Sequence, residues 1–155
     1  MLFLDSKARE WCVRLDLGLC LKLRNALRLD LLDPAKTGDV TALLIDRERL
    51  GNVLWALVTD QATAAGVARE EFYSALDSDA LGAGWGALVE AFTDFCPRPN
   101  REAVREAIAT QTEAMERAGR ELAEMVKGPE AAGAIDRAIA DAKAKMAESL
   151  KAVGV

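Results

Sequence analysis

The 155-residue sequence contains no histidine, and its three cysteines occur without CxxC spacing. The absence of histidine removes the usual general base of enzymes. An odd number of widely spaced cysteines also argues against a disulfide framework and a structural zinc site. We therefore interpret Cys12, Cys20 and Cys96 as small buried hydrophobic residues, and we expect no metal and no cofactor.

Aromatic residues are scarce as well, at 5% of the chain, whereas alanine is abundant. This composition favours closely packed helices and argues against an all-β fold. The net charge is -5, with acidic and basic residues interspersed, so the sequence offers no basic face to nucleic acid. The apolar runs are far shorter than the roughly 20 residues of a membrane span, and no signal peptide is recognisable. We expect a cytoplasmic protein that binds neither nucleic acid nor membrane.

Two amphipathic stripes between residues 50 and 96 predict the core. Their apolar residues follow the i, i+3, i+4, i+7 spacing of one helix face. The first helix is expected to run from Asp46 to Ala65 and to stop at Gly66, a suitable residue for the left-handed position after a helix. A short helix over residues 68–76 should bridge to the second core helix. The stripe residues are Leu50, Val53, Leu54, Leu57 and Val58, and then Leu81, Trp85, Leu88, Val89, Phe92 and Phe95.

Strand-like residues at 2–4 and 11–15 predict a small N-terminal β-hairpin with a turn between them. In the second segment Trp11, Val13 and Leu15 alternate with more polar residues, as in a half-buried strand. Because an isolated hairpin is only marginally stable, its apolar face must lie on the helices or on another chain. The hairpin also presents an exposed sheet edge.

Two further helices are expected between the hairpin and the core. Asp16 can cap the first, whose apolar positions include Leu17, Cys20, Leu21 and Leu27. Residues 38–39 can cap a short second helix that reaches residue 45.

The composition changes after Pro97 and Pro99 to alanine, glutamate and arginine without aromatic residues. Apolar or small residues then recur four and three apart, with Gln111 at the one polar step, which predicts a heptad seam up to Lys127. A similar seam continues beyond residue 128, so we predict a helical hairpin over residues 100–153. The seam either packs on itself or forms an adaptable groove for a partner. The candidate partner-binding residues are Val104, Ile108, Met115, Leu122, Met125, Ile135, Ile139 and Met146.

These patterns together predict a mainly α (α+β) protein with three parts. A small N-terminal β-hairpin and a compact helical core form residues 1–97, and an α-helical hairpin forms residues 98–155. We therefore place the domain boundary between residues 97 and 98.

Two motifs resemble ligand sites but lack their decisive residues. Residues 77–82 match the first, third and sixth positions of a calcium-binding loop, but Leu81 and Leu88 stand where oxygen ligands are needed. The three glycines within residues 82–86 lack both a lysine and a preceding strand, so they do not predict a phosphate-binding loop. We interpret Asp77 as a helix cap, and the glycines as positions of close helix packing or of reduced helix stability.

Several segments together resemble small proteins encoded in the tail modules of tailed phages and prophages. The segments are Thr59–Val67, Glu70–Leu76, Asp79–Leu81 and Leu88–Phe95 before Pro97, with Leu29–Asp33 and the hairpin upstream. The likeness covers residues 11–108. Such proteins resemble tail assembly chaperones, whose genes lie near those of the major tail protein and the tape-measure protein.

The resemblance implies a chaperone that holds a tape-measure-like protein until the tail tube protein polymerises around it. Its partners would then be phage tail proteins, with a homo-oligomer also open, and its location the cytoplasm of the bacterial host. The alternative is a structural virion component, such as a tail or connector subunit. An enzyme is disfavoured, because no catalytic constellation is present in the sequence.

Overall fold

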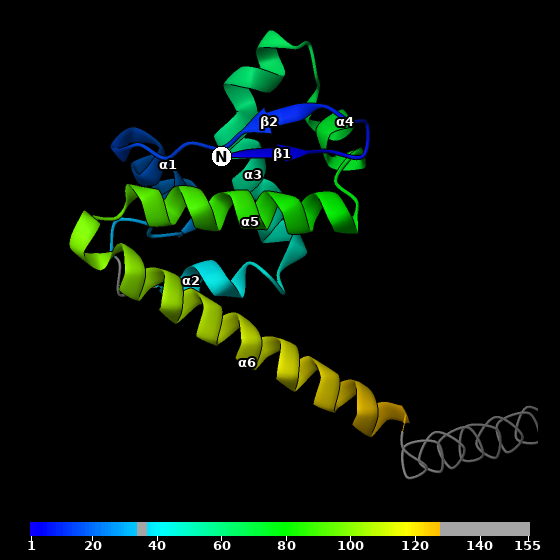
Figure 1. Cartoon of the computed structure of the whole chain (residues 1–155). Helices are drawn as coiled ribbons and strands as arrows, with labels where there is room; N and C mark the ends of the chain where they lie inside the picture. Colours follow the sequence, from blue (N-terminus) through cyan, green and yellow to red (C-terminus); the bar gives the residue numbers. More distant parts are fainter. Residues whose placement is uncertain (34–36, 128–155) are drawn as a thin grey trace, which may run out of the picture. The chain divides into compact units, whose positions relative to one another are not determined.

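The computed structural model describes residues 1–33 and 37–127 and divides the chain into two compact units. The first unit comprises Met1–Thr112, and the second begins at Glu113. Figure 1 shows that the first unit is built of helices around a two-stranded sheet, which confirms the predicted fold class. Among the described helices, none combines the length and the hydropathy that a membrane span requires.

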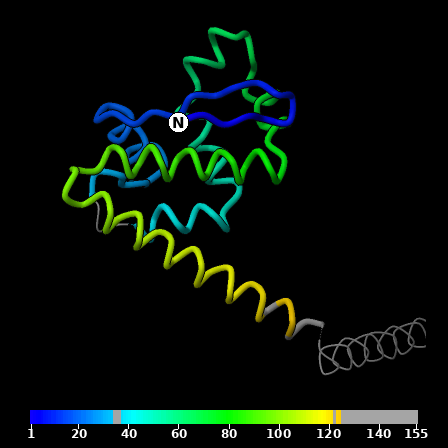
Figure 2. The backbone as a smooth tube through the Cα atoms, viewed as in Figure 1, coloured from blue at the N-terminus to red at the C-terminus, as the bar shows by residue number. Residues whose placement is uncertain are grey.

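The N-terminal hairpin consists of β1 (Leu2–Leu4) and β2 (Glu10–Cys12), which pair antiparallel with Phe3 opposite Trp11. The Phe3 and Trp11 side chains are both buried, whereas Cys12 is only half-buried, so the predicted alternation is confirmed. The second strand ends at Cys12 rather than at residue 15. Figure 2 shows the two strands side by side and joined by a turn, with helix α5 next to β1.

The helix α1 (Leu17–Leu27) begins as predicted, because Asp16 Oδ1 accepts a hydrogen bond from the Leu19 amide at 2.8 Å. Its buried residues are Cys20 and Leu23, whereas Leu17 is 60% exposed and therefore lies outside the core-facing side predicted for it. The short helix α2 (Thr37–Ala42) ends before residue 45, where it was expected to end.

The three central helices lie close to their predicted bounds. They are α3 (Arg47–Ala64), α4 (Arg69–Ser74) and α5 (Ser78–Phe95). In the second predicted stripe Leu88 and Phe92 are buried, whereas Leu81, Trp85, Val89 and Phe95 are only half-buried. Asp46 caps α3 by accepting from the Arg49 amide at 2.9 Å, and Asp77 caps α5 by accepting from the Ala80 amide at 2.8 Å. Gly66 follows α3 with φ of 69°, the left-handed conformation that glycine adopts without strain.

The glycines of α5 differ in their surroundings. A Cβ atom added at Gly84 would lie 2.6 Å from Leu54 Cδ1 of α3, whereas one added at Gly82 or Gly86 would meet nothing within 4 Å. The predicted close packing of helices is therefore confirmed at Gly84 alone. The buried face of α5 combines small residues with Leu88 and Phe92, and its members are Ala80, Gly84, Ala87, Leu88, Ala91, Phe92 and Thr93.

Aromatic rings connect the hairpin to the helices. The ring centroids of Trp11 and Phe72 are 5.3 Å apart in an edge-to-face arrangement, and Phe72 also lies 5.4 Å from Trp55. These contacts join β2, α4 and α3, so the hairpin is an integral part of the core.

The first unit extends further along the chain than the predicted boundary. After a 3-10 turn, helix α6 (Arg101–Lys127) begins, and its residues Val104 and Ile108 are only 4% and 2% exposed within the main core. Gln111 reaches Thr41 of α2, whose hydroxyl lies 2.9 Å from Gln111 Oε1. Because successive turns of α6 contact the core through residue 111, the first unit ends at Thr112 rather than at residue 97.

Candidate functional site

The residues of the predicted partner-binding seam differ in their burial. Val104 and Ile108 are buried in the core of the first unit, so they are unavailable to a partner, which corrects their assignment. Met115 is half-buried on α6 in the second unit. Leu122 and Met125 belong to α6, but their side chains lie outside the described part, as do all of Ile135, Ile139 and Met146. For these last residues, partner binding stays a prediction.

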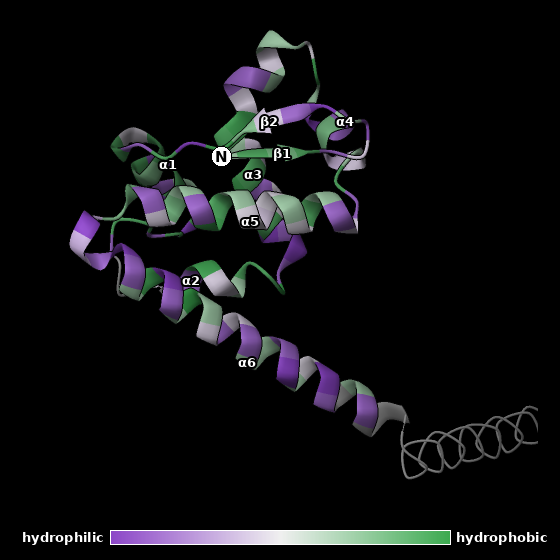
Figure 3. Ribbon diagram, in the orientation of Figure 1, coloured by the Kyte–Doolittle hydropathy of each residue, from purple (hydrophilic) through white to green (hydrophobic). Residues whose placement is uncertain are grey.

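The outer face of the hairpin exposes apolar side chains instead. Leu2 and Leu4 are 58% and 54% exposed, and they lie on the face opposite Phe3, because side chains alternate along a strand. Met1, immediately before this strand, is also exposed. Figure 3 shows β1 coloured as hydrophobic. We call Met1, Leu2 and Leu4 the hairpin patch.

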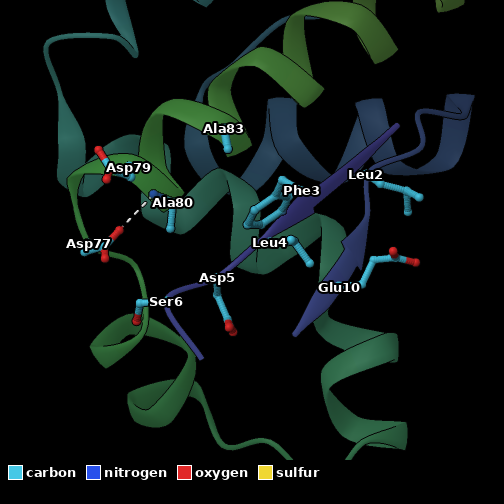
Figure 4. Close-up of a pocket in the computed structure, with 10 residues that line it drawn as sticks. All are labelled: Leu2, Phe3, Leu4, Asp5, Ser6, Glu10, Asp77, Asp79, Ala80 and Ala83. Carbon is cyan, nitrogen blue, oxygen red and sulfur yellow. Dashed lines mark hydrogen bonds between the residues drawn. The ribbon is translucent and has the colours of Figure 1, made fainter. Parts of the chain in front are cut away.

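A groove of about 440 Å³ lies beside the hairpin patch, between β1 and the start of α5. The small side chains of Ala80 and Ala83 line its α5 side. Figure 4 shows Asp77 and Asp79 at the start of α5, on the other side of β1 from Glu10. None of the described residues that line the groove is basic, so its lining combines apolar and acidic side chains. The lining residues are Leu2, Phe3, Leu4, Asp5, Ser6, Glu10, Asp77, Asp79, Ala80 and Ala83.

The backbone groups at the two edges of the sheet have different hydrogen-bond partners. Met1 and Val13 exchange hydrogen bonds of 2.8 and 2.7 Å, so the backbone groups of Leu2 and Leu4 point away from β2. On the opposite edge, the Gln61 side chain accepts from the Cys12 amide at 2.9 Å and donates to the Cys12 carbonyl at 2.7 Å. The carboxamide of Gln61 thus takes the place of a third strand at β2, whereas β1 borders the groove.

The turn of the hairpin is fixed by Asp5, whose carboxylate is buried. Asp5 accepts hydrogen bonds from the amides of Lys7 and Arg9, from Arg9 Nε at 2.7 Å and from Trp11 Nε1 at 2.9 Å. Burial by itself would raise the pKa of Asp5, but the hydrogen bonds from Trp11, Arg9 and Lys7 outweigh it, so the pKa is lowered. The charged carboxylate is therefore the form that the fold stabilises.

The same turn is attached to α4 through Glu71. Its carboxylate pairs with Arg9 Nη1 at 2.7 Å and with Lys7 Nζ at 3.1 Å. The hydrogen bond and charge of Lys7, followed by the charge of Arg9, hold the pKa of Glu71 below its ordinary value. With Trp11 in the core and the turn attached to α4, the hairpin patch is carried on a well-anchored support.

The described residues offer little for covalent or metal chemistry. Burial, and then the negative charges of Asp16 and Asp30, raise the pKa of the Cys20 thiol to about 11. Burial likewise raises the pKa of Cys96. Both thiols are therefore protonated at neutral pH, and both are buried, as predicted from the sequence. Within residues 1–33 and 37–127, no group of three or more potential metal ligands is clustered.

Comparison of the chain with protein-family models, with curated proteins and with solved structures gave no match. An exposed apolar patch on a rigid support, next to a small groove lined by apolar and acidic side chains, suits the binding of a polypeptide segment.

The sequence contains a signal for this site that periodicity alone does not single out. β1 consists of three apolar residues in succession, Leu2, Phe3 and Leu4, although a strand with one buried face needs an apolar residue only at every second position. The additional apolar residues, Leu2 and Leu4, therefore lie on the exposed face.

Proposed function

We propose that this protein is a binding protein whose hairpin patch and adjacent groove hold an apolar segment of a partner. The observation that carries the proposal is the exposure of Leu2 and Leu4 beside the groove with its acidic side chains. In biological terms, we propose a tail assembly chaperone that binds a tape-measure-like protein during phage tail assembly in the host cytoplasm. The resemblance of residues 11–108 to tail-module proteins supports this assignment.

The size and charge of the site define the segment that it would hold. A groove of about 440 Å³ accommodates a few apolar side chains rather than a whole folded domain. Glu10, Asp77 and Asp79 would favour basic residues on either side of those side chains, since opposite charges speed association and select the partner. A modest contact of this kind binds reversibly, which an assembly chaperone requires because it must release its client.

Co-purification provides the direct test. The protein would be co-expressed with a tagged tape-measure-like protein encoded in the same tail module, and the amount retained would be measured. The double substitution Leu2→Ser with Leu4→Ser should reduce retention at least tenfold. The matched control is Ile45→Ser, because Ile45 is 74% exposed and belongs to the segment between α2 and α3 rather than to the hairpin. Equal retention by the native and double-substituted proteins, with both folded, would refute the proposed site.

Purified phage particles separate the chaperone from the structural alternative. An assembly chaperone should be missing from the mature particle, whereas a tail or connector subunit should be present in a fixed ratio to the tail tube protein. Mass spectrometry of purified particles measures this ratio. Stoichiometric presence would show that the chain is a structural subunit.

A further inference from the structure

A second cleft, lined mainly by α3 and α4 and also by Leu81 of α5, combines apolar side chains with two arginines and one glutamate. Its volume is about 430 Å³, and Tyr73, Leu76 and Leu81 contribute the apolar part of its lining. Arg47, in the first turn of α3, and Arg69, in the first turn of α4, also line it. The cleft shares no lining residue with the groove beside the hairpin.

The Arg69 side chain is held in place by uncharged groups. Its Nε donates to the Tyr73 hydroxyl oxygen at 2.9 Å, and its Nη2 donates to Asn52 Oδ1 at 2.9 Å. The guanidinium carbon also lies 5.2 Å from the centroid of the Tyr73 ring. The Tyr73 hydroxyl donates in turn to Asn52 Oδ1 at 2.8 Å, which closes a triangle of hydrogen bonds. The guanidinium is thus oriented before any ligand arrives.

The two arginines share this cleft with one described acidic residue, Glu48, which forms an ion pair with neither of them. Among the described residues, no carboxylate lies within ion-pair distance of Arg69 or Arg47, in contrast to Arg9, which pairs with both Asp5 and Glu71. A guanidinium carries five N–H donors, and Arg69 uses two of them on Tyr73 and Asn52. Donors therefore remain for an anion.

We propose that this cleft binds the C-terminal residue of a partner polypeptide. Its α-carboxylate would bind Arg69, with Arg47 nearby, and its apolar side chain would cover Tyr73, Leu76 and Leu81. A guanidinium matches a carboxylate in a planar, two-bond geometry. A chain terminus carries the carboxylate and the side chain on one carbon atom, so both fit into a cleft of this size. The inference is independent of the proposed function of the hairpin patch.

Three short peptides distinguish this ligand from its alternatives. They are acetyl-Gly-Ala-Leu with a free C-terminal carboxylate, the same peptide as the C-terminal amide, and acetyl-Ala-Asp-Leu amide, whose carboxylate is internal. Each would be titrated into the full-length protein at low ionic strength by isothermal titration calorimetry. We expect the free acid to bind, and both amides to bind at least tenfold more weakly.

Substitutions then locate the binding. Arg69→Gln should weaken binding of the free acid at least tenfold, and Tyr73→Phe should weaken it less, because it removes only the hydroxyl that orients Arg69. Glu48→Gln should strengthen binding two- to threefold, because Glu48 is the acidic residue that lines the cleft. Arg24→Gln, at an exposed position of α1 outside the cleft, is the matched control and should have no effect.

Clear outcomes would overturn the proposal. Equal affinity for the free acid and its amide would show that the terminal carboxylate is not recognised, and equal affinity for the internal aspartate would show that a terminus is not required. Absence of measurable binding of the free acid at millimolar concentration would exclude the site. Unchanged affinity of Arg69→Gln, with a native melting temperature, would place any binding elsewhere.

Discussion

Substitution of Gly84 by alanine is expected to test the packing of α5 on α3 directly. The added Cβ atom would lie 2.6 Å from Leu54 Cδ1, 3.3 Å from Leu54 Cδ2 and 3.5 Å from Leu54 Cγ, whereas carbon atoms normally approach to about 3.5–4.0 Å. Leu54 is fully buried, so it has little room to move. Overpacking of this kind costs about 1–3 kcal/mol, while alanine gains about 1 kcal/mol over glycine in a helix.

The neighbouring glycines provide the control for the gain in helix propensity. Gly82→Ala and Gly86→Ala gain the same helix propensity, but their Cβ atoms meet nothing within 4 Å, so each should stabilise the protein by up to about 1 kcal/mol. Subtracting the change in unfolding free energy of these two variants from that of Gly84→Ala isolates the cost of the steric clash with Leu54. The expected difference in the free energy of unfolding is therefore about 1–3 kcal/mol.

Urea unfolding followed by tryptophan fluorescence is the appropriate assay, because Trp11, Trp55 and Trp85 all lie in the first unit. Leu54→Val should cost less in the Gly84→Ala background than in the native protein, since the smaller side chain makes room for the new methyl group. If Gly84→Ala stabilises the protein as much as Gly82→Ala does, the two helices do not approach as closely as described.

Three further outcomes are expected from the same fluorescence assay. Asp5→Asn should cost about 2–3 kcal/mol at neutral pH, because it removes a charged acceptor of four hydrogen bonds. The pKa of Asp5 is lowered in the folded state, so its charged carboxylate stabilises the fold above the unfolded pKa of about 3.9, and this stabilisation is lost as the pH falls through the folded-state pKa. The difference in unfolding free energy between the native protein and Asp5→Asn should therefore shrink in acid. A difference that stays constant with pH would contradict this. Phe92→Ala should cost about 3–5 kcal/mol, and a loss below about 0.5 kcal/mol would show that the α5 stripe is not buried. A chain that ends at Arg98 should unfold at much lower urea than one that ends at Thr112, because only the longer chain keeps Val104 and Ile108 in the core; equal midpoints would restore the boundary at residue 97.

The helices that the sequence predicted well are those whose determinants are local. Asp46 and Asp77 cap the helices that follow them, and Gly66 ends α3, because capping depends on a few neighbouring residues. The hairpin was predicted for the same reason, through the alternation around Trp11. In each case the interaction that decides the structure spans only a few positions in the chain.

The boundary of the core could not be predicted in this way. A heptad seam has the same appearance whether it faces a partner helix or the core, so Val104 and Ile108 could not be distinguished from Met115 by their spacing. The contact of Gln111 with Thr41 spans 70 positions, and no local pattern reports it. The cleft on α3 and α4 was missed similarly, because Arg69 meets Asn52 only after the two helices have packed.

The contact between Gln61 and Cys12 has a consequence for the ageing of the protein. Slow hydrolysis of a glutamine side chain by water releases ammonia and leaves a carboxylate, which has acceptors but no hydrogen to donate. At Gln61 such a carboxylate would still accept from the Cys12 amide but would face the Cys12 carbonyl oxygen, now without its donor. A single chemical lesion would thereby expose the second edge of the sheet, and aged preparations would be expected to associate through β2.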